Sequence, residues 1–144
     1  NDVSIITGPG KGVEASAQVG AVVAEKPSRL VLACGHEADL NDEEVALGVQ
    51  VEKKGVLLSE YSPLVKKSPE REAASRRLVV ALAQAVLVIA TSGGDALTEA
   101  TFELAIQQGK PIFVFNSSPN ADFPAEGIPL AGEEEIDLIV RSLV

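Results

Sequence analysis

The sequence predicts a single Rossmann-like α/β domain, a three-layer α/β/α arrangement in which helices cover both faces of a mostly parallel sheet. Short apolar runs alternate with helical stretches of about 10–15 residues, the pattern of strands joined by crossover helices. The hydrophobic fraction is 46%, but the chain has only four Phe, one Tyr and no Trp or Met, so Val, Leu, Ile and Ala must form the core. Apolar runs without alternation are typical of strands buried on both faces.

The predicted strands are apolar runs that stop at glycine or at polar turn residues. In chain order they cover residues 3–7, 30–33, 56–58, 85–90 and 111–115. The stretches between them and the end of the chain have helical composition. The predicted helices cover residues 13–25, 42–54, 69–82, 96–108 and 133–143.

Helix boundaries are marked by capping residues. Ser68 and Asp95 are placed as N-caps, and Gly55 and Gly109 stand where a helix C-terminus favours glycine. The last helix is amphipathic. Residues 116–132 are rich in Pro, Gly and Asn, and we expect an irregular segment there.

Charge and cysteine content limit the function classes. Acidic residues outnumber Lys and Arg by 21 to 12, a net charge of −9 that repels a polyanion unless basic groups gather locally. Cys34 is the only cysteine, which favours a reducing, cytoplasmic setting. No apolar run is long enough to span a membrane, so we expect no membrane role. The chain begins without an initiator Met, and we expect it to be a fragment of a longer protein, with residues 1–144 forming one domain.

Two glycine-rich turns follow predicted strands, where ligands of open parallel sheets bind. Bare N–H groups at such turns, with the helix N-terminus behind them, attract phosphate. The candidate phosphate-binding residues on these turns are Gly8, Gly10, Lys11, Gly12, Ser92, Gly93 and Gly94. We expect the two turns to share one rim. The spacing of the first turn matches neither the dinucleotide-binding fingerprint nor the P-loop. A plain tight turn remains the alternative for both.

The turn after the second predicted strand reads Cys34-Gly35-His36, and Gly35 is a further candidate for the ligand site. One Cys and one His cannot supply the three or four ligands of a zinc site, and no third group is identifiable to orient a Cys–His nucleophile. We therefore expect neither a metal site nor a Cys–His nucleophile at this turn, and we assign no cofactor and no catalytic residue in the favoured interpretation.

Five segments, in order, resemble the DNA-processing protein DprA (Smf) family, which belongs to a broader group with the LOG-type nucleotide enzymes. They are residues 7–15 (TGPGKGVEA), 32–35 (LACG), 55–61 (GVLLSEY), 75–88 (SRRLVVALAQAVLV), and 92–94 (SGG) with 105–113 (AIQQGKPIF). The resemblance implies binding of single-stranded DNA, assistance to a recombinase and self-association as a homodimer. It adds Arg77 to the candidate site, as the retained last residue of the family's Arg-Asn-Arg.

Departures from the family pattern keep alternatives open. The family's first strand is absent, and its Arg-Asn-Arg is here Ser75-Arg76-Arg77. Loss of basic residues weakens the inference to DNA, because phosphate contacts dominate nucleic-acid affinity. The alternative is a small-molecule module that binds a nucleotide or nucleotide sugar, and a nucleotide hydrolase using Glu60 or Glu99 ranks third. Residues 92–100 lack the Gly-Thr of the LOG motif, which disfavours a LOG-type phosphoribohydrolase.

Overall fold

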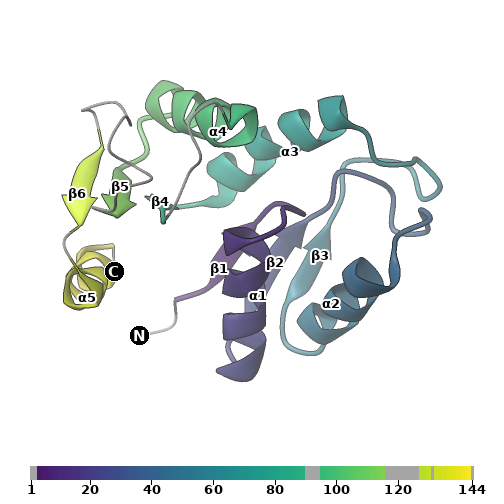
Figure 1. The fold of residues 1–144 in the computed structure, drawn as a ribbon, viewed down its shortest axis with the longest axis horizontal. Helices are drawn as coiled ribbons and strands as arrows, with labels where there is room; N and C mark the ends of the chain where they lie inside the picture. The colour runs from purple at the N-terminus through teal and green to yellow at the C-terminus, as the bar shows by residue number, and fades with distance from the viewer. Residues whose placement is uncertain (1–2, 90–94, 116–126, 131, 144) are drawn as a thin grey trace. The chain divides into compact units, whose positions relative to one another are not determined.

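The computed structural model describes residues 3–89, 95–115, 127–130 and 132–143. Figure 1 shows the order of the elements along the chain. The strands in these residues are β1 (Ile5–Thr7), β2 (Ser28–Val31), β3 (Val56–Leu58), β4 (Val86–Val88), β5 (Ile112–Phe115) and β6 (Ile128–Leu130). The helices are α1 (Val13–Val23), α2 (Asp42–Glu52), α3 (Pro69–Leu82), α4 (Ala96–Gln107) and α5 (Glu133–Ser142).

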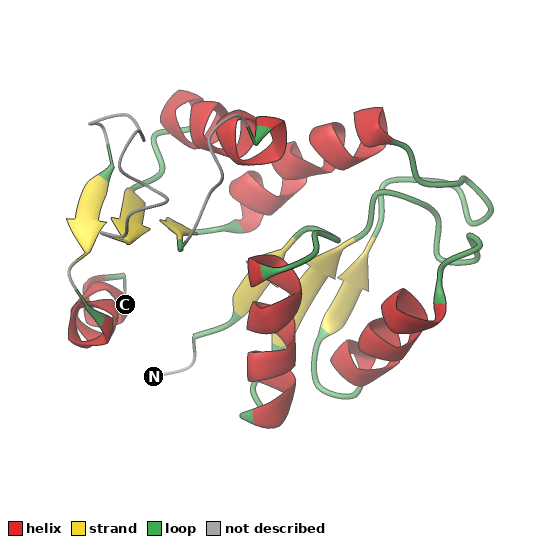
Figure 2. Cartoon of the chain, in the orientation of Figure 1, coloured by secondary structure: helices red, strands yellow, loops and turns green. Residues whose placement is uncertain are grey.

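The described strands form two parallel sheets, with strand orders β1-β2-β3 and β4-β5-β6 (Figure 2). Every neighbouring pair is parallel, with Ile5 of β1 opposite Ser28 of β2 and Arg29 of β2 opposite Val56 of β3. Parallel strands joined through helices confirm the predicted Rossmann-like α/β class.

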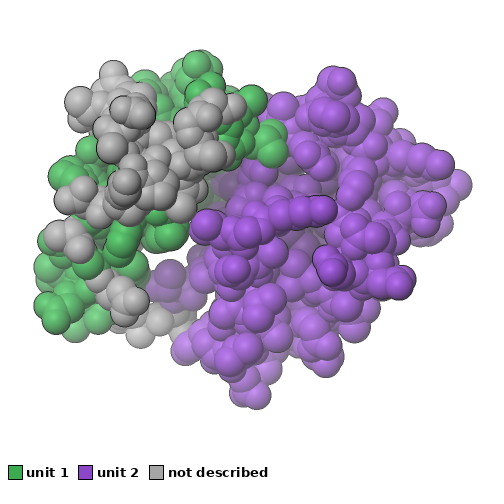
Figure 3. Space-filling model, viewed as in Figure 1, with its two compact units in different colours: residues 1, 80–144 green, residues 2–79 purple. Residues whose placement is uncertain are grey.

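The chain divides into two compact units, coloured separately in Figure 3. We call residues 2–79 the first unit and residues 80–144, with residue 1, the second unit. The boundary falls within α3. The expectation of a single domain stays a prediction.

The core of the first unit lies between its sheet and two helices. Leu30, Leu32, Cys34 and Val51 form a buried cluster. Helices α1 and α2 contact each other as well as the strands that they connect, so they cover the same face of the sheet. Successive right-handed crossovers between neighbouring parallel strands produce this arrangement.

The second unit has its own apolar core. Its buried cluster consists of Val80, Val88, Phe102, Ala105, Ile112 and Val114. Helix α4 packs on β4 and β5, and α5 contacts β6.

Strand β6 corrects one expectation. The segment 116–132 was expected to be irregular throughout, but residues 128–130 pair in parallel with β5, with Pro129 opposite Val114. Proline has no N–H to donate to a neighbouring strand. Pro129 is tolerated because β6 stands at the end of the described strand order and has a described neighbour on one side only. A Cβ on Gly127 would lie 2.4 Å from Val114 Cγ2, so glycine allows the close approach. The rest of the segment lies outside the described residues.

The predicted helix ends are largely confirmed. Asp95 accepts a hydrogen bond from the Leu97 N–H (3.2 Å), and the Ser68 hydroxyl accepts one from the Arg71 N–H (3.3 Å). Gly109 has a φ of 64°, the left-handed conformation of a helix stop. Gly55 also stands at the end of α2, where its N–H donates to the Val51 carbonyl (2.7 Å), but its φ is not left-handed. A Cβ there would lie 2.1 Å from the Ser28 carbonyl oxygen, so the glycine also lets the chain entering β3 pass close to β2.

Candidate functional site

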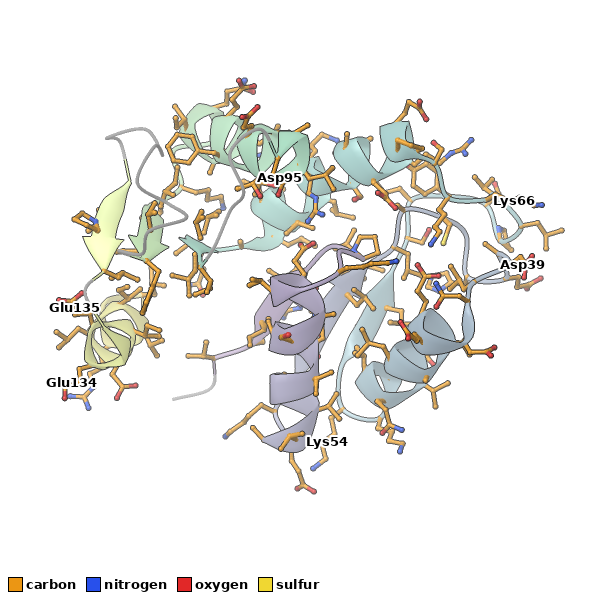
Figure 4. The ribbon with its side chains drawn as sticks, viewed as in Figure 1. Asp39, Lys54, Lys66, Asp95, Glu134 and Glu135 are labelled. Carbon is orange, nitrogen blue, oxygen red and sulfur yellow. The ribbon has the colours of Figure 1, made fainter. Side chains whose placement is uncertain are left out.

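Three loops leave the same edge of the first sheet, because they follow parallel strands. We call this region the carboxyl edge; it consists of the loops after β1, β2 and β3, at residues 8–12, 32–41 and 59–68. Within the first unit, Figure 4 shows Lys66 and Asp39 at this edge and Lys54 at the opposite one. Four of the predicted site residues, Gly8, Gly10, Lys11 and Gly12, lie on its first loop.

The turn after β1 is filled on one side by a buried ion pair. The Arg76 guanidinium donates to both carboxylate oxygens of Glu14, with Nη2 at 2.9 Å from Oε2, and the Gly8 N–H donates to Oε1 (3.0 Å). A Cβ on Gly8 would lie 2.6 Å from Arg76 Nη1, and one on Gly10 would lie 1.8 Å from Glu14 Oε2. The two glycines therefore make room for this pair, and the Gly8 N–H already has an anionic partner.

Sequence reasoning missed Glu14 and Arg76. Arg76 is only 4% exposed, whereas Arg77, the predicted site residue, is exposed and paired with Glu60. The signal was present in the helical spacing. Arg76 stands three and four residues before Val79 and Val80, which are buried, and it therefore shares their face of α3.

The other side of the turn is open. Lys11 is exposed. Gly12, with a φ of 70°, is the N-cap of α1 and, as a glycine, has no side chain to cap the helix. Ion pairs between described residues do not include Lys11. Lys11 thus offers a positive charge beside the start of a helix.

Glu44 at the start of α2 links the three loops electrostatically. Burial raises its pKa, but hydrogen bonds from the Lys67 ammonium and the Asn41 N–H, with the charges of Lys67 and Lys11, outweigh burial, so its pKa is lowered. The charge of Lys11 is therefore felt at the end of the loop after β2, and Lys67 ties the loop after β3 to the same helix.

Gly35 also lies at this edge, but it is covered. A Cβ there would lie 2.1 Å from the carbonyl oxygens of both Ser62 and Pro63, and its N–H donates to the Val65 carbonyl (2.8 Å). The position thus packs the loop after β2 against the loop after β3. Burial raises the pKa of the neighbouring Cys34 thiol, which disfavours the thiolate that a nucleophile needs.

The loop after β3 carries an aromatic and basic group. Arg71 of α3 lies over the Tyr61 ring, with its guanidinium carbon 5.7 Å from the ring centroid, and its Nη1 donates to the Lys66 carbonyl (2.8 Å). Arg77 donates to Glu60 on the same loop, with 59% of the Arg77 side chain exposed.

The structure thus brings most of the predicted residues to one edge. The residues placed there are Gly8, Gly10, Lys11, Gly12 and Gly35, with Arg77 tied to the edge through Glu60. Ser92, Gly93 and Gly94 lie outside the described residues, so the shared rim of the two turns stays a prediction.

The described part of the chain contains no cluster of three or more His, Cys, Asp or Glu side chains that could hold a metal. None of its helices is long and apolar enough to cross a membrane.

Two solved structures of DNA processing protein A have the same fold. The Helicobacter pylori protein, reported for its single-stranded DNA binding mode, matches with a TM-score of 0.81 and 20% identity over 96% of this chain and 66% of its own. The Streptococcus pneumoniae protein matches with a TM-score of 0.76 and 18% identity over 96% of this chain and 51% of its own. A glycosyltransferase of S. pneumoniae, GlyE, reaches 0.52 at 14% identity, over 99% of this chain and 32% of its own.

At these identities the likeness is one of fold, and the chain spans less than two thirds of either DNA processing protein. No curated protein matches the sequence. The family model described as DNA recombination-mediator protein A matches residues 1–128, which confirms the resemblance found in the five sequence segments. The chain therefore belongs to the DNA recombination-mediator protein A family.

Proposed function

We propose that this chain is a DNA-processing protein that binds single-stranded DNA at the carboxyl edge of its first sheet. Family membership and the DNA binding named for the H. pylori relative support the ligand class. The observation that carries the proposal for this chain is the distribution of its charges.

The net charge of −9 is unevenly divided between the two units. Residues 2–79 contain ten of the twelve Lys and Arg and twelve of the 21 Asp and Glu, a net charge of −2. Residues 80–144 contain two basic and nine acidic residues, a net charge of −7. Most of the basic groups therefore lie in the first unit, where they nearly balance the acidic ones, so a polyanion meets less repulsion there than the total charge suggests.

Several of these basic groups are free to meet phosphates. Lys11 and Lys66 are exposed on carboxyl-edge loops, and the ion pairs found among described residues include neither. Arg77 is bound to Glu60 in a pair that solvent reaches, with 59% and 38% of the side chains exposed, so a phosphate can replace the carboxylate at low cost. We assign phosphate contacts to Lys11, Lys66 and Arg77.

A charge reversal at each end of α1 tests whether the DNA binds at the carboxyl edge. Lys11 precedes the helix, and Lys26 follows it at the opposite edge of the sheet; both are exposed. We expect Lys11→Glu to weaken binding of a fluorescent oligothymidylate of about 20 nucleotides by about five- to thirtyfold in low-salt anisotropy titrations. Lys26→Glu, with the same charge change, should have little effect. The salt dependence of Lys11→Glu should also be shallower, by about 0.7 in log–log slope for each lost phosphate contact.

Equal losses in the two variants would mean that only net charge matters and would reject the carboxyl edge as the site. No binding by the unchanged protein at low salt would reject the DNA-binding function itself.

A small-molecule nucleotide or nucleotide sugar remains the second candidate, supported by the charge of −9. A thermal-shift panel of nucleotides that leaves the melting temperature unmoved would remove it. A hydrolase has less support, because Glu60 is bound to Arg77 and Glu99 is exposed on α4 rather than buried in a cleft.

Family membership also motivates three broader proposals for the full-length protein. They are assistance to a recombinase, self-association as a homodimer and a cytoplasmic location.

A further inference from the structure

We propose that Tyr61 and Arg71 form a platform on which a nucleobase of the bound DNA strand stacks. This inference rests on the proposed function and adds a base contact to its phosphate contacts. It assigns the recognition of a single strand, rather than of charge alone, to one aromatic side chain.

The pair has the geometry of a cation–π contact. The Arg71 guanidinium carbon lies 5.7 Å from the centroid of the Tyr61 ring, within the range of such contacts. The hydrogen bond from Arg71 Nη1 to the Lys66 carbonyl (2.8 Å) restricts the guanidinium plane. Both side chains remain partly exposed, so a flat ligand can reach them.

The loop that carries Tyr61 is held by a chain of hydrogen bonds. The Tyr61 N–H donates to the Ser59 hydroxyl (3.0 Å), which itself donates to the Cys34 carbonyl (2.6 Å). The Gly35 and Glu37 N–H groups donate to the Val65 and Pro63 carbonyls, each at 2.8 Å. The ring is thus presented by a fixed backbone, and little order must be created when a base stacks on it.

The surroundings of the platform suit a nucleic acid strand. Leu64 on the same loop is 74% exposed, and Lys66 and Lys67 follow it. An aromatic ring and an arginine plane offer stacking surfaces that accept any base, and Lys66, which is exposed, is placed to contact the backbone of the strand. Duplex DNA keeps its bases stacked inside, so such a platform selects an unpaired strand.

Tyr61 can be observed directly, because the chain has one Tyr and no Trp. We expect oligothymidylate to quench the intrinsic tyrosine fluorescence of the unchanged protein in a saturable titration. An abasic oligonucleotide of the same length and charge should bind through phosphate contacts without quenching. Thymidine monophosphate, at the same concentration of bases, should quench far less than the strand.

Variants then measure the contribution of the ring. Tyr61→Leu should weaken oligothymidylate binding by about 5- to 150-fold, the range for loss of one base–aromatic stack, and leave abasic binding unchanged. Tyr61→Phe should retain the affinity, because the stacking face is kept. Lys11→Glu should weaken binding of both oligonucleotides.

The outcomes separate this inference from the proposed function. If the strand binds but the tyrosine signal does not change, or if Tyr61→Leu binds both oligonucleotides as tightly as the unchanged protein, the platform is rejected and phosphate binding stands. Equal quenching by thymidine monophosphate would reject a strand as the ligand. If neither oligonucleotide binds, the proposed function fails. The fluorescence titration uses the unchanged protein, so it remains decisive if Tyr61→Leu does not fold.

Discussion

Arg76 and Arg77 are adjacent in sequence but occupy opposite environments. The Arg76 side chain is 5% exposed and bound to Glu14, whereas the Arg77 side chain is 59% exposed and bound to Glu60. A buried pair that loses one partner leaves an uncompensated charge in the protein interior, while an exposed pair contributes little because water screens it.

Matched substitutions should separate these two roles. Arg76→Met should lower the free energy of unfolding by about 3 kcal/mol, toward the lower end of the range for a broken buried pair because Glu14 is partly exposed. Arg77→Met should lower it by less than about 1 kcal/mol. Denaturant titrations followed by circular dichroism measure both values, and similar losses in the two variants would contradict the assignment of Arg76 as the structural arginine.

The burial of Arg76 could have been predicted from the sequence, but its ion-pair partner could not. Helical spacing places Arg76 on the buried face of α3, and this could have been predicted. The identity of its partner could not, because Glu14 lies 62 positions away and meets it only through the tertiary fold. Arg77 was favoured on family resemblance, which carries no information on burial in this chain.

At the scale of elements, α2 depends on interactions at its first turn. Its 11 residues are too few to be stable alone. Asn41 and Glu44 form a reciprocal capping box, with bonds of 3.0 and 3.1 Å, and Lys67 adds an ion pair with Glu44. This corner also fixes the loop after β3 at the carboxyl edge.

The ion pair predicts a pH dependence. The pKa of Glu44 is lowered by Lys67 and the Asn41 N–H against the opposing effect of burial, so its contribution is full above the ordinary value of 4.5 and is lost as the pH falls through the lowered pKa. The pKa of Lys67 is raised by its bond to Glu44, so its contribution is present below 10.5 and is lost as the pH rises through the raised pKa.

Lys67→Gln should therefore cost up to about 1 kcal/mol of unfolding free energy at neutral pH, because the ammonium is partly exposed, and the cost should shrink below pH 4.5. Lys66→Gln is the control, since Lys66 forms no ion pair with a described residue. Denaturant titrations across this pH range provide the test. A cost that does not change with pH would contradict the ion pair as its source.

Helices were predicted more accurately than short strands, for a physical reason. Capping residues such as Asp95 and Gly109 act within a few positions of a helix end and are visible locally. Strand β6 has only three residues, one of them Pro129, and it exists through pairing with β5. Such pairing is decided by contacts distant in sequence, which local propensity does not reveal.

At the scale of the whole molecule, net charge alone is misleading. The value of −9 argues against nucleic acid, yet −7 of it belongs to residues 80–144 and only −2 to residues 2–79. A polyanion therefore meets less repulsion at the first unit. The sequence contained this asymmetry, but its meaning required the boundary between the units.

The carboxyl edge was predictable from topology, because parallel strands place their following loops together. That Glu14 and Arg76 fill the turn after β1 could not be predicted from topology. Their presence shifts the proposed phosphate contacts from the buried Gly8 N–H to the exposed Lys11.

The central claim is that single-stranded DNA binds at the carboxyl edge, and amide chemical-shift mapping with an oligothymidylate tests it most directly. We predict that the largest shifts in residues 2–79 fall in the loops at 8–12, 32–41 and 59–68 and around Arg71 and Arg77 of α3. Shifts concentrated instead at the opposite edge, around Lys26 and Lys54, would contradict the claim.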